Sequence, residues 1–151
     1  MMHASLIWPP FKLQDIKRIE SVQHHFFRML SRKIGMPMNP FEHDYSSISS
    51  KFNIITLEAS RAHCDLSFIF NVLNGKIKCT TLEALIFHRN LDYSLKHPRV
   101  LSEYKYTRNY ASESTIPRSI RLYNALPIQI RNINHAPLFK KDTNRYVSAN
   151  Y

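Results

Sequence analysis

Apolar positions in the first part of the chain follow a helical period. They recur every three or four residues between positions 11 and 35, at Ile16, Ile19, Val22, Phe26, Leu30 and Ile34. This spacing predicts a helix of about six turns with one apolar stripe facing a core. Gly35 can end that helix in the left-handed conformation, and Pro37 forbids its continuation.

A second strong helix is predicted between Thr56, which can cap its start, and Gly75, which can end it. Its second half is apolar almost all round, which predicts burial on several sides. Weaker helices are expected at 45–52, at 80–87, at 117–126 and at 137–147. In the second of these, Thr80 and Glu83 have capping-box spacing, and Phe139 anchors the last.

The remaining segments lack a helical period. Residues 4–8 form a short apolar run before two prolines, which indicates a strand without a partner nearby. Residues 89–115 predict a long irregular connection with an extended piece at 103–109. The sequence therefore predicts a mainly α fold: a small irregular helical domain of about four to five helices, with an orphan N-terminal strand and a long connection. The expected parts are 1–10, 11–88 and 89–151.

Composition favours a polyanionic partner. The chain has 2 glycines, which disfavours a hairpin-rich β fold, and its formal net charge is +10. Residues 41–75 carry 2 − 4 = −2, whereas the segments 1–40, 76–110 and 111–151 each carry +4. A polyanion, such as RNA, DNA or an acidic membrane, should therefore meet the ends of the chain, with the middle as scaffold. Without a secretory signal or a long apolar run, we expect an intracellular protein, cytoplasmic or nuclear, that is not secreted and contacts no membrane.

Catalytic patterns are not visible in the sequence. The acidic residues are scattered, with no Asp-Asp or Asp-x-Asp pair to hold two metal ions. The one conceivable metal set is His63, Cys64, Cys79 and His88, but His63 and Cys64 point about 100° apart on a helix. We expect no catalytic residue, no metal and no cofactor for this chain.

Aromatic residues interleave with basic ones, as at 26–28 and 104–108, and such a pattern can stack bases while binding phosphates. An equally simple interpretation is that Phe26 belongs to the core and the tyrosines are merely amphipathic. Asp65 lies four residues after Arg61, which indicates an ion pair on the helix surface. Tyr123 and Asn124 are expected to fix a helix end before Pro127.

Five segments, in order, resemble the region downstream of the polymerase core in reverse transcriptases of non-LTR retrotransposons of the jockey-like insect type. The segments are ASLIWPP, DIKRIESVQHHFFRML, LEASRAHCDLSFIFNVLNGKI, RSIRLYNALP and PLFKK. The motif positions that we assign a structural role are Trp8, Glu20, Gln23, Asp65, Asn74, Gly75, Tyr123, Asn124 and Pro127. The chain departs from the family at His3-Ala4, where Tyr-Gly is usual, and it contains no Asp-Asp metal site.

The resemblance implies a fragment of an RNA-directed DNA polymerase whose parent family uses Mg²⁺. Residues 1–10 would end the missing polymerase core, 11–88 would be thumb-like, and 89–151 would be a basic, aromatic-rich tail. The expected partners are RNA or an RNA–DNA duplex, bound weakly and without sequence preference, and the missing core. The candidate nucleic-acid-binding residues are Lys17, Arg18, Arg28, Arg32, Lys33, Lys105 and Arg108. The alternative is a structural relic of a truncated mobile element with no activity of its own.

Overall fold

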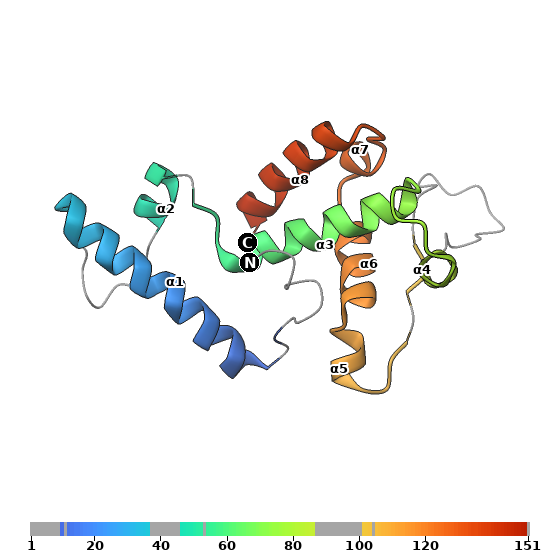
Figure 1. The fold of residues 1–151 in the computed structure, drawn as a ribbon, viewed down its shortest axis with the longest axis horizontal. Helices are drawn as coiled ribbons and strands as arrows, with labels where there is room; N and C mark the ends of the chain where they lie inside the picture. The colour runs from blue at the N-terminus through green and yellow to red at the C-terminus, as the bar shows by residue number, and fades with distance from the viewer. Residues whose placement is uncertain are drawn as a thin grey trace. The chain divides into compact units, whose positions relative to one another are not determined.

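The fold is built from short and medium helices. The computed structural model describes residue 10 and residues 12–36, 46–52, 54–86, 101–103 and 105–150. The helices in these residues are α1 (Leu13–Ile34), α2 (Ser46–Phe52), α3 (Leu57–Leu73), α4 (Thr80–Leu85), α5 (Asn109–Ser112), α6 (Thr115–Ala125), α7 (Ile128–Arg131) and α8 (Ala136–Asn150) (Figure 1). The mainly α prediction is confirmed. The predicted strand at 4–8, with Trp8, lies outside the described residues.

The chain forms two compact units, and the boundary between them lies within α3. The N-terminal unit comprises residues 10–58, and the C-terminal unit continues from residue 59 to the end of the chain. Side chains of α3 pair with side chains of α6 and α8, which ties residues 59–73 to the C-terminal part of the chain. The division expected from the sequence, after residues 10 and 88, stays a prediction, and residue 88 lies outside the described residues.

The N-terminal unit has a small core between α1 and α2. Phe27 of α1 and Ile48 of α2 are buried, and Leu30 and Ile54 pack against them. Gly35 ends α1 with φ +65°, in the left-handed conformation that glycine adopts at low cost. The predicted end of this helix is confirmed.

The register of α1 differs from the predicted apolar stripe. Ile19 is 42%, Val22 70% and Phe26 49% exposed, although all three were expected to face the core. Successive residues on a helix point about 100° apart, so only one of the two adjacent phenylalanines can meet α2. Because Ile48 packs on Phe27, Phe26 is turned outward.

The C-terminal unit is organised around α3. The second half of this helix is buried, as predicted, through Leu66, Ile69, Phe70 and Val72. Both α6 and α8 pack on it (Figure 1). These two helices contribute the buried residues Ile120, Tyr123, Phe139 and Val147. Gly75, with φ +65°, ends α3 as expected, and Phe139 anchors the last helix as expected.

The short helices depart from the sequence analysis. α4 begins at Thr80 itself, and its N-cap is Cys79, which makes no side-chain cap bond, so the predicted capping box is wrong. The four-residue α5 and the first residue of α6 lie within the segment expected to be irregular. Helices of one turn carry too few residues to show a period in the sequence. Among the described helices, none combines the length and apolarity that crossing a membrane requires.

Candidate nucleic-acid interface

The basic side chains of α1 gather on one arc of its surface. At about 100° per residue, Lys17, Arg28, Arg32 and Arg18 fall within an arc of about 100°. All four are exposed. From Lys17 to Arg32 the arc extends about 22 Å along the helix, at about 1.5 Å per residue.

Acidic residues lie outside this arc. α1 contains Asp15 and Glu20 as its only carboxylates. On the helical wheel each carboxylate lies about 60° beyond one edge of the arc: Asp15 beyond Arg18, and Glu20 beyond Lys17. Glu20 is on the side that faces the core and is half-buried. The side chains that share the arc with the bases are Gln14, Ser21 and His25. We call the face formed by Lys17, Arg18, Arg28 and Arg32 the basic arc of α1.

Three of the predicted nucleic-acid-binding residues lie elsewhere. Lys33 is exposed but follows Phe26 by seven residues, so it belongs to the neighbouring, apolar side of α1. Lys105 and Arg108 are exposed and belong to the C-terminal unit. A guanidinium nitrogen of Arg108 donates to the Tyr110 hydroxyl at 3.3 Å.

Gln23 joins α1 to the start of α3. Its Nε2 donates to the carbonyl of Ile55 at 2.9 Å, and its Oε1 accepts from the N–H of Leu57 at 3.1 Å. Leu57 is the first residue of α3, so its N–H has no partner within the helix. One side-chain amide therefore holds the basic helix against the segment that leads into α3.

Replacing this amide tests that role. Gln23→Ala should lower the free energy of unfolding of the N-terminal unit by about 1–3 kcal/mol, because two half-buried backbone groups lose their partner. Urea denaturation followed by circular dichroism measures the change. The control is Gln14→Ala, on the exposed side of the same helix, with an expected change within about 0.5 kcal/mol. Equal effects of the two substitutions would contradict the role of Gln23.

Asp65 and Arg118 form a buried ion pair between α3 and α6. The guanidinium donates from Nε to Oδ2 at 2.6 Å and from Nη2 to Oδ1 at 2.9 Å, and Nη1 donates to the carbonyl of Glu113 at 3.0 Å. The Asp65 side chain is 1% exposed and that of Arg118 18%. The expected surface location of Asp65 is wrong, because its side chain is buried. Arg118 reaches it from α6 with the two-pronged geometry that suits a carboxylate, and the charge of Arg61 also acts on it.

Burial raises the pKa of the Asp65 carboxyl, because it removes water from the charged form. The hydrogen bond and the charge of Arg118 act in the opposite direction, and so does the charge of Arg61. This balance is typical of a carboxylate that depends on its guanidinium partner, which gives the pair a structural role.

The Tyr123-Asn124 motif joins segments. The Asn124 side chain accepts from the N–H of Leu101 at 2.9 Å and donates to its carbonyl at 3.0 Å, as a neighbouring strand would. It also donates to Glu103 at 2.7 Å. The Tyr123 hydroxyl points to the carbonyl of Arg131, at 3.5 Å. These residues therefore hold residues 101–103 and α7 against α6, whereas the sequence analysis expected them only to fix a helix end. Pro127 follows α6, as predicted, and is the N-cap of α7.

Asn74 lies at the end of α3. Its Nδ2 donates to the carbonyl of Phe70 at 2.8 Å. The same carbonyl also accepts from the backbone N–H of Asn74 at 3.0 Å, so both bonds close the last turn of the helix before the left-handed Gly75. Asn74 and Gly75 thus have a local structural explanation.

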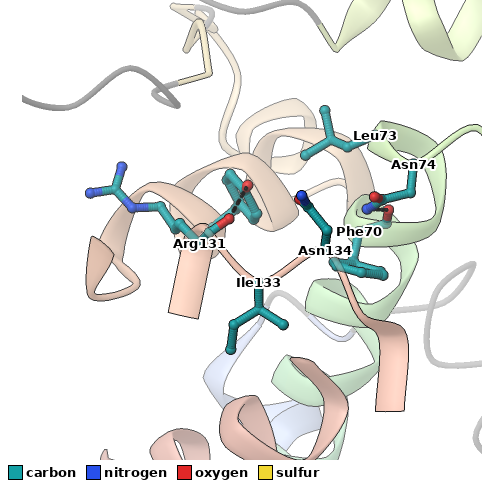
Figure 2. A pocket seen from close by; sticks show the side chains of 7 residues that line it. Phe70, Leu73, Asn74, Arg131, Ile133 and Asn134 are labelled. Atoms are coloured by element: carbon teal, nitrogen blue, oxygen red, sulfur yellow. Dashed lines mark hydrogen bonds between the residues drawn. The ribbon is translucent and has the colours of Figure 1, made fainter. Parts of the chain in front are cut away.

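A pocket of about 150 Å³ opens beside Asn74. It is lined by Phe70, Leu73, Asn74, Tyr123, Arg131, Ile133 and Asn134 (Figure 2). Figure 2 shows the guanidinium of Arg131 pointing away from Phe70 and Asn74. The lining offers apolar surface and amide groups, and it includes no carboxylate, imidazole or thiol.

His63 is half-buried on α3. Burial lowers the pKa of its imidazole, and the charge of Lys140 lowers it further. Its Nδ1 lies 3.4 Å from Oγ1 of Thr143, and that hydroxyl donates to the carbonyl of Phe139 at 2.7 Å. His63 therefore has a structural explanation, as a half-buried side chain between α3 and α8 whose surroundings disfavour the charged form. Within the described ranges no group of three His, Cys, Asp or Glu side chains is placed to hold a metal ion.

Sequence reasoning missed one residue of the site. Arg118 was not singled out, because no local signal connects it with Asp65 across the chain. For Phe26 the sequence left two interpretations open, a core position and an exposed ring among the bases, and its 49% exposure fits the second. Comparisons with protein-family models, with curated proteins and with solved structures gave no match.

Proposed function

We propose that this chain is a non-catalytic C-terminal segment of an RNA-directed DNA polymerase from a non-LTR retrotransposon, and that it contacts nucleic acid through the sugar–phosphate backbone. The observation that carries the proposal is the basic arc of α1, whose four exposed bases extend over about 22 Å of the helix with neither of the two carboxylates of α1 among them. Such a row matches the repeating charge of a phosphate backbone and reads no base edges. The resemblance of five ordered segments supplies the parent family. The partners are RNA or an RNA–DNA duplex, and the role places the chain in the cytoplasm or nucleus.

The experiment measures the salt dependence of binding. Lys17→Ala, Arg18→Ala and Arg32→Ala are combined in one variant, and fluorescence anisotropy reports its binding to a labelled RNA of about 20 nucleotides between about 50 and 200 mM salt. Removing three phosphate contacts should make the log–log salt slope shallower by about 2, and weaken binding about 100-fold at about 0.1 M salt, because fewer counterions are released.

The matched control removes the same charge elsewhere. Lys140→Ala, Lys141→Ala and Arg145→Ala change three exposed residues of α8, so both triple variants have a formal charge of 10 − 3 = +7. The control should keep most of its affinity. Equal losses in both variants would show that net charge rather than α1 governs binding. No binding by the unaltered chain would rule out the proposal.

A second candidate is favoured by the exposed apolar residues of α1. Val22 is 70%, Phe26 49% and Met29 49% exposed, and these large apolar side chains gather on one side of the helix. This observation supports the structural relic, in which the surface once covered by the polymerase core is left open. The relic would bind no nucleic acid in the salt titration, so the same experiment separates the two candidates.

A further inference from the structure

An exposed aromatic ring lies beside the basic arc. Phe26 is 49% exposed, and its ring centroid lies 6.1 Å from that of Phe27, with the planes tilted by 51°. Phe27 is 3% exposed and packs with Ile48 of α2. Phe26 is therefore held outward on a helix whose other phenylalanine is fixed in the core.

Phe26 belongs to an apolar row next to the bases. Ile19, Val22, Phe26 and Met29 follow one another at steps of three and four residues, and all are exposed. On the helical wheel Met29 lies about 20° from Arg18, so the row adjoins the basic arc directly. Lys33 continues the row two turns after Phe26, and Asp15 precedes Ile19 in it by one turn, at the start of the helix. Arg18 lies about two turns before Phe26.

A ligand that covers both the basic arc and the apolar row must carry negative charge where it meets the arc. Where it meets the row, it must present a flat apolar surface. A base-paired duplex presents phosphates and hides the faces of its bases, so it would leave the row uncovered. An unpaired strand presents both, because its phosphates can meet the arc while a base stacks on an aromatic ring. An acidic protein helix or a lipid surface would match the charge but would not require a ring at position 26.

We propose that α1 binds unpaired nucleic acid in preference to duplex, with Phe26 as the platform on which a base stacks. This inference rests on the proposed function and names its substrate class. Phe26 stacks the base, the basic arc holds the adjoining phosphates, and Phe27 fixes the position of the platform from the core side. Stacking accepts any base, so binding has no sequence preference.

The test compares two probes that share one sequence. A labelled single-stranded RNA of about 20 nucleotides and the blunt duplex formed with its complement are titrated at about 0.1 M salt. The unaltered chain should bind the single strand more tightly. Phe26→Ala should weaken single-strand binding about 10-fold and leave duplex binding unchanged, because one stacked base is lost. Leu13→Ala, at an exposed position away from the row, is the control and should change neither.

Two further variants separate stacking from general apolar contact. Phe26→Leu keeps an exposed apolar side chain without a ring and should lose nearly as much affinity as Phe26→Ala. Phe26→Trp should keep the affinity, and its fluorescence should be quenched by the RNA beyond the response of the unaltered chain, whose single tryptophan is Trp8.

Each other outcome overturns the inference in a recognisable way. Full affinity of Phe26→Leu would replace stacking by plain apolar contact. An equal loss for single strand and duplex would remove the preference. If Phe26→Ala changes only self-association or vesicle binding, the row is a protein or lipid interface. If the Lys17→Ala, Arg18→Ala, Arg32→Ala variant loses affinity while Phe26→Ala behaves in one of these ways, the proposed function stands without base stacking at Phe26. If neither this triple variant nor Phe26→Ala changes binding, the proposed function and the base-stacking inference both fail.

Discussion

Arg118→Ala is expected to lower the free energy of unfolding of the C-terminal unit by about 3–5 kcal/mol, because it leaves a buried carboxylate without its partner. Asp65 is 1% exposed and receives two hydrogen bonds from this one guanidinium. Chemical denaturation monitored by circular dichroism measures the loss. Arg118→Lys should recover little of it, since an ammonium cannot donate in parallel to both carboxylate oxygens.

The neighbouring Arg121 offers a matched control. It lies on the same helix, one turn away, and pairs with Glu113 at 2.8 Å, but both side chains are 42% exposed. Arg121→Ala should cost no more than about 1 kcal/mol, because water screens the pair. A loss in Arg118→Ala as small as in this control would mean that Arg61 takes over the carboxylate.

The loss in Arg118→Ala should also depend on pH. Burial raises the pKa of Asp65 above its ordinary value of 3.8, and removing Arg118 removes the main opposing influence, so the pKa rises further. Between the unfolded and the folded pKa, the folded variant holds a proton that the unfolded chain has released. Its stability therefore falls as the pH rises through this window. The difference in free energy of unfolding between Arg118→Ala and the unaltered chain should therefore be smaller at about pH 5 than at about pH 7.

Helix ends were the most predictable part of the fold. Gly35 and Gly75 both adopt φ +65° where a helix was expected to stop, since few other residues take that conformation cheaply. Pro117 lies in the first turn of α6, and Pro127 follows the end of that helix. These signals are local: they depend on the backbone of one or two residues and need no knowledge of the rest of the chain.

The face of α1 that meets the core could not be predicted in the same way. Phe26 and Phe27 are adjacent, and an apolar stripe can be drawn through either of them. Phe27 faces the core because it packs against Ile48 of α2. This contact is not visible in the sequence, since α2 has four serines among its seven residues and no apolar period of its own. The outward position of Phe26, on which the inference of base stacking depends, is thus a property of packing between elements.

The pairing of Asp65 was unpredictable for a related reason. In the sequence, Arg61 is the obvious partner because it lies one helical turn away. Arg118 is separated from Asp65 by 53 positions and reaches it only after α6 packs on α3. The same holds for Asn124, whose amide takes the place of a strand beside Leu101. Motif residues recognised by resemblance therefore acquire their roles only through contacts between helices.

Phe139→Ala is expected to remove about 3–5 kcal/mol from the stability of the C-terminal unit. Phe139 is fully buried, and its ring stacks on that of Phe70, with centroids 4.2 Å apart and planes 22° apart. This contact ties α8 to α3, so its loss opens a cavity and also removes an aromatic pair that contributes about 0.5–1.5 kcal/mol beyond burial. Thermal denaturation with near-ultraviolet circular dichroism measures both the stability and the ring packing.

The adjacent Leu138 makes the comparison specific, since it lies on the same turn of α8 but is 47% exposed. Leu138→Ala should cost less than about 1 kcal/mol. Phe139→Leu keeps most of the volume and should cost less than Phe139→Ala, so it gives a measurable value even where the alanine variant unfolds. In a double-mutant cycle with Phe70→Leu, the effects of the two substitutions should not add, because each removes the same ring contact. Additive effects, or equal losses at positions 138 and 139, would mean that α8 is not held to α3 through this aromatic pair.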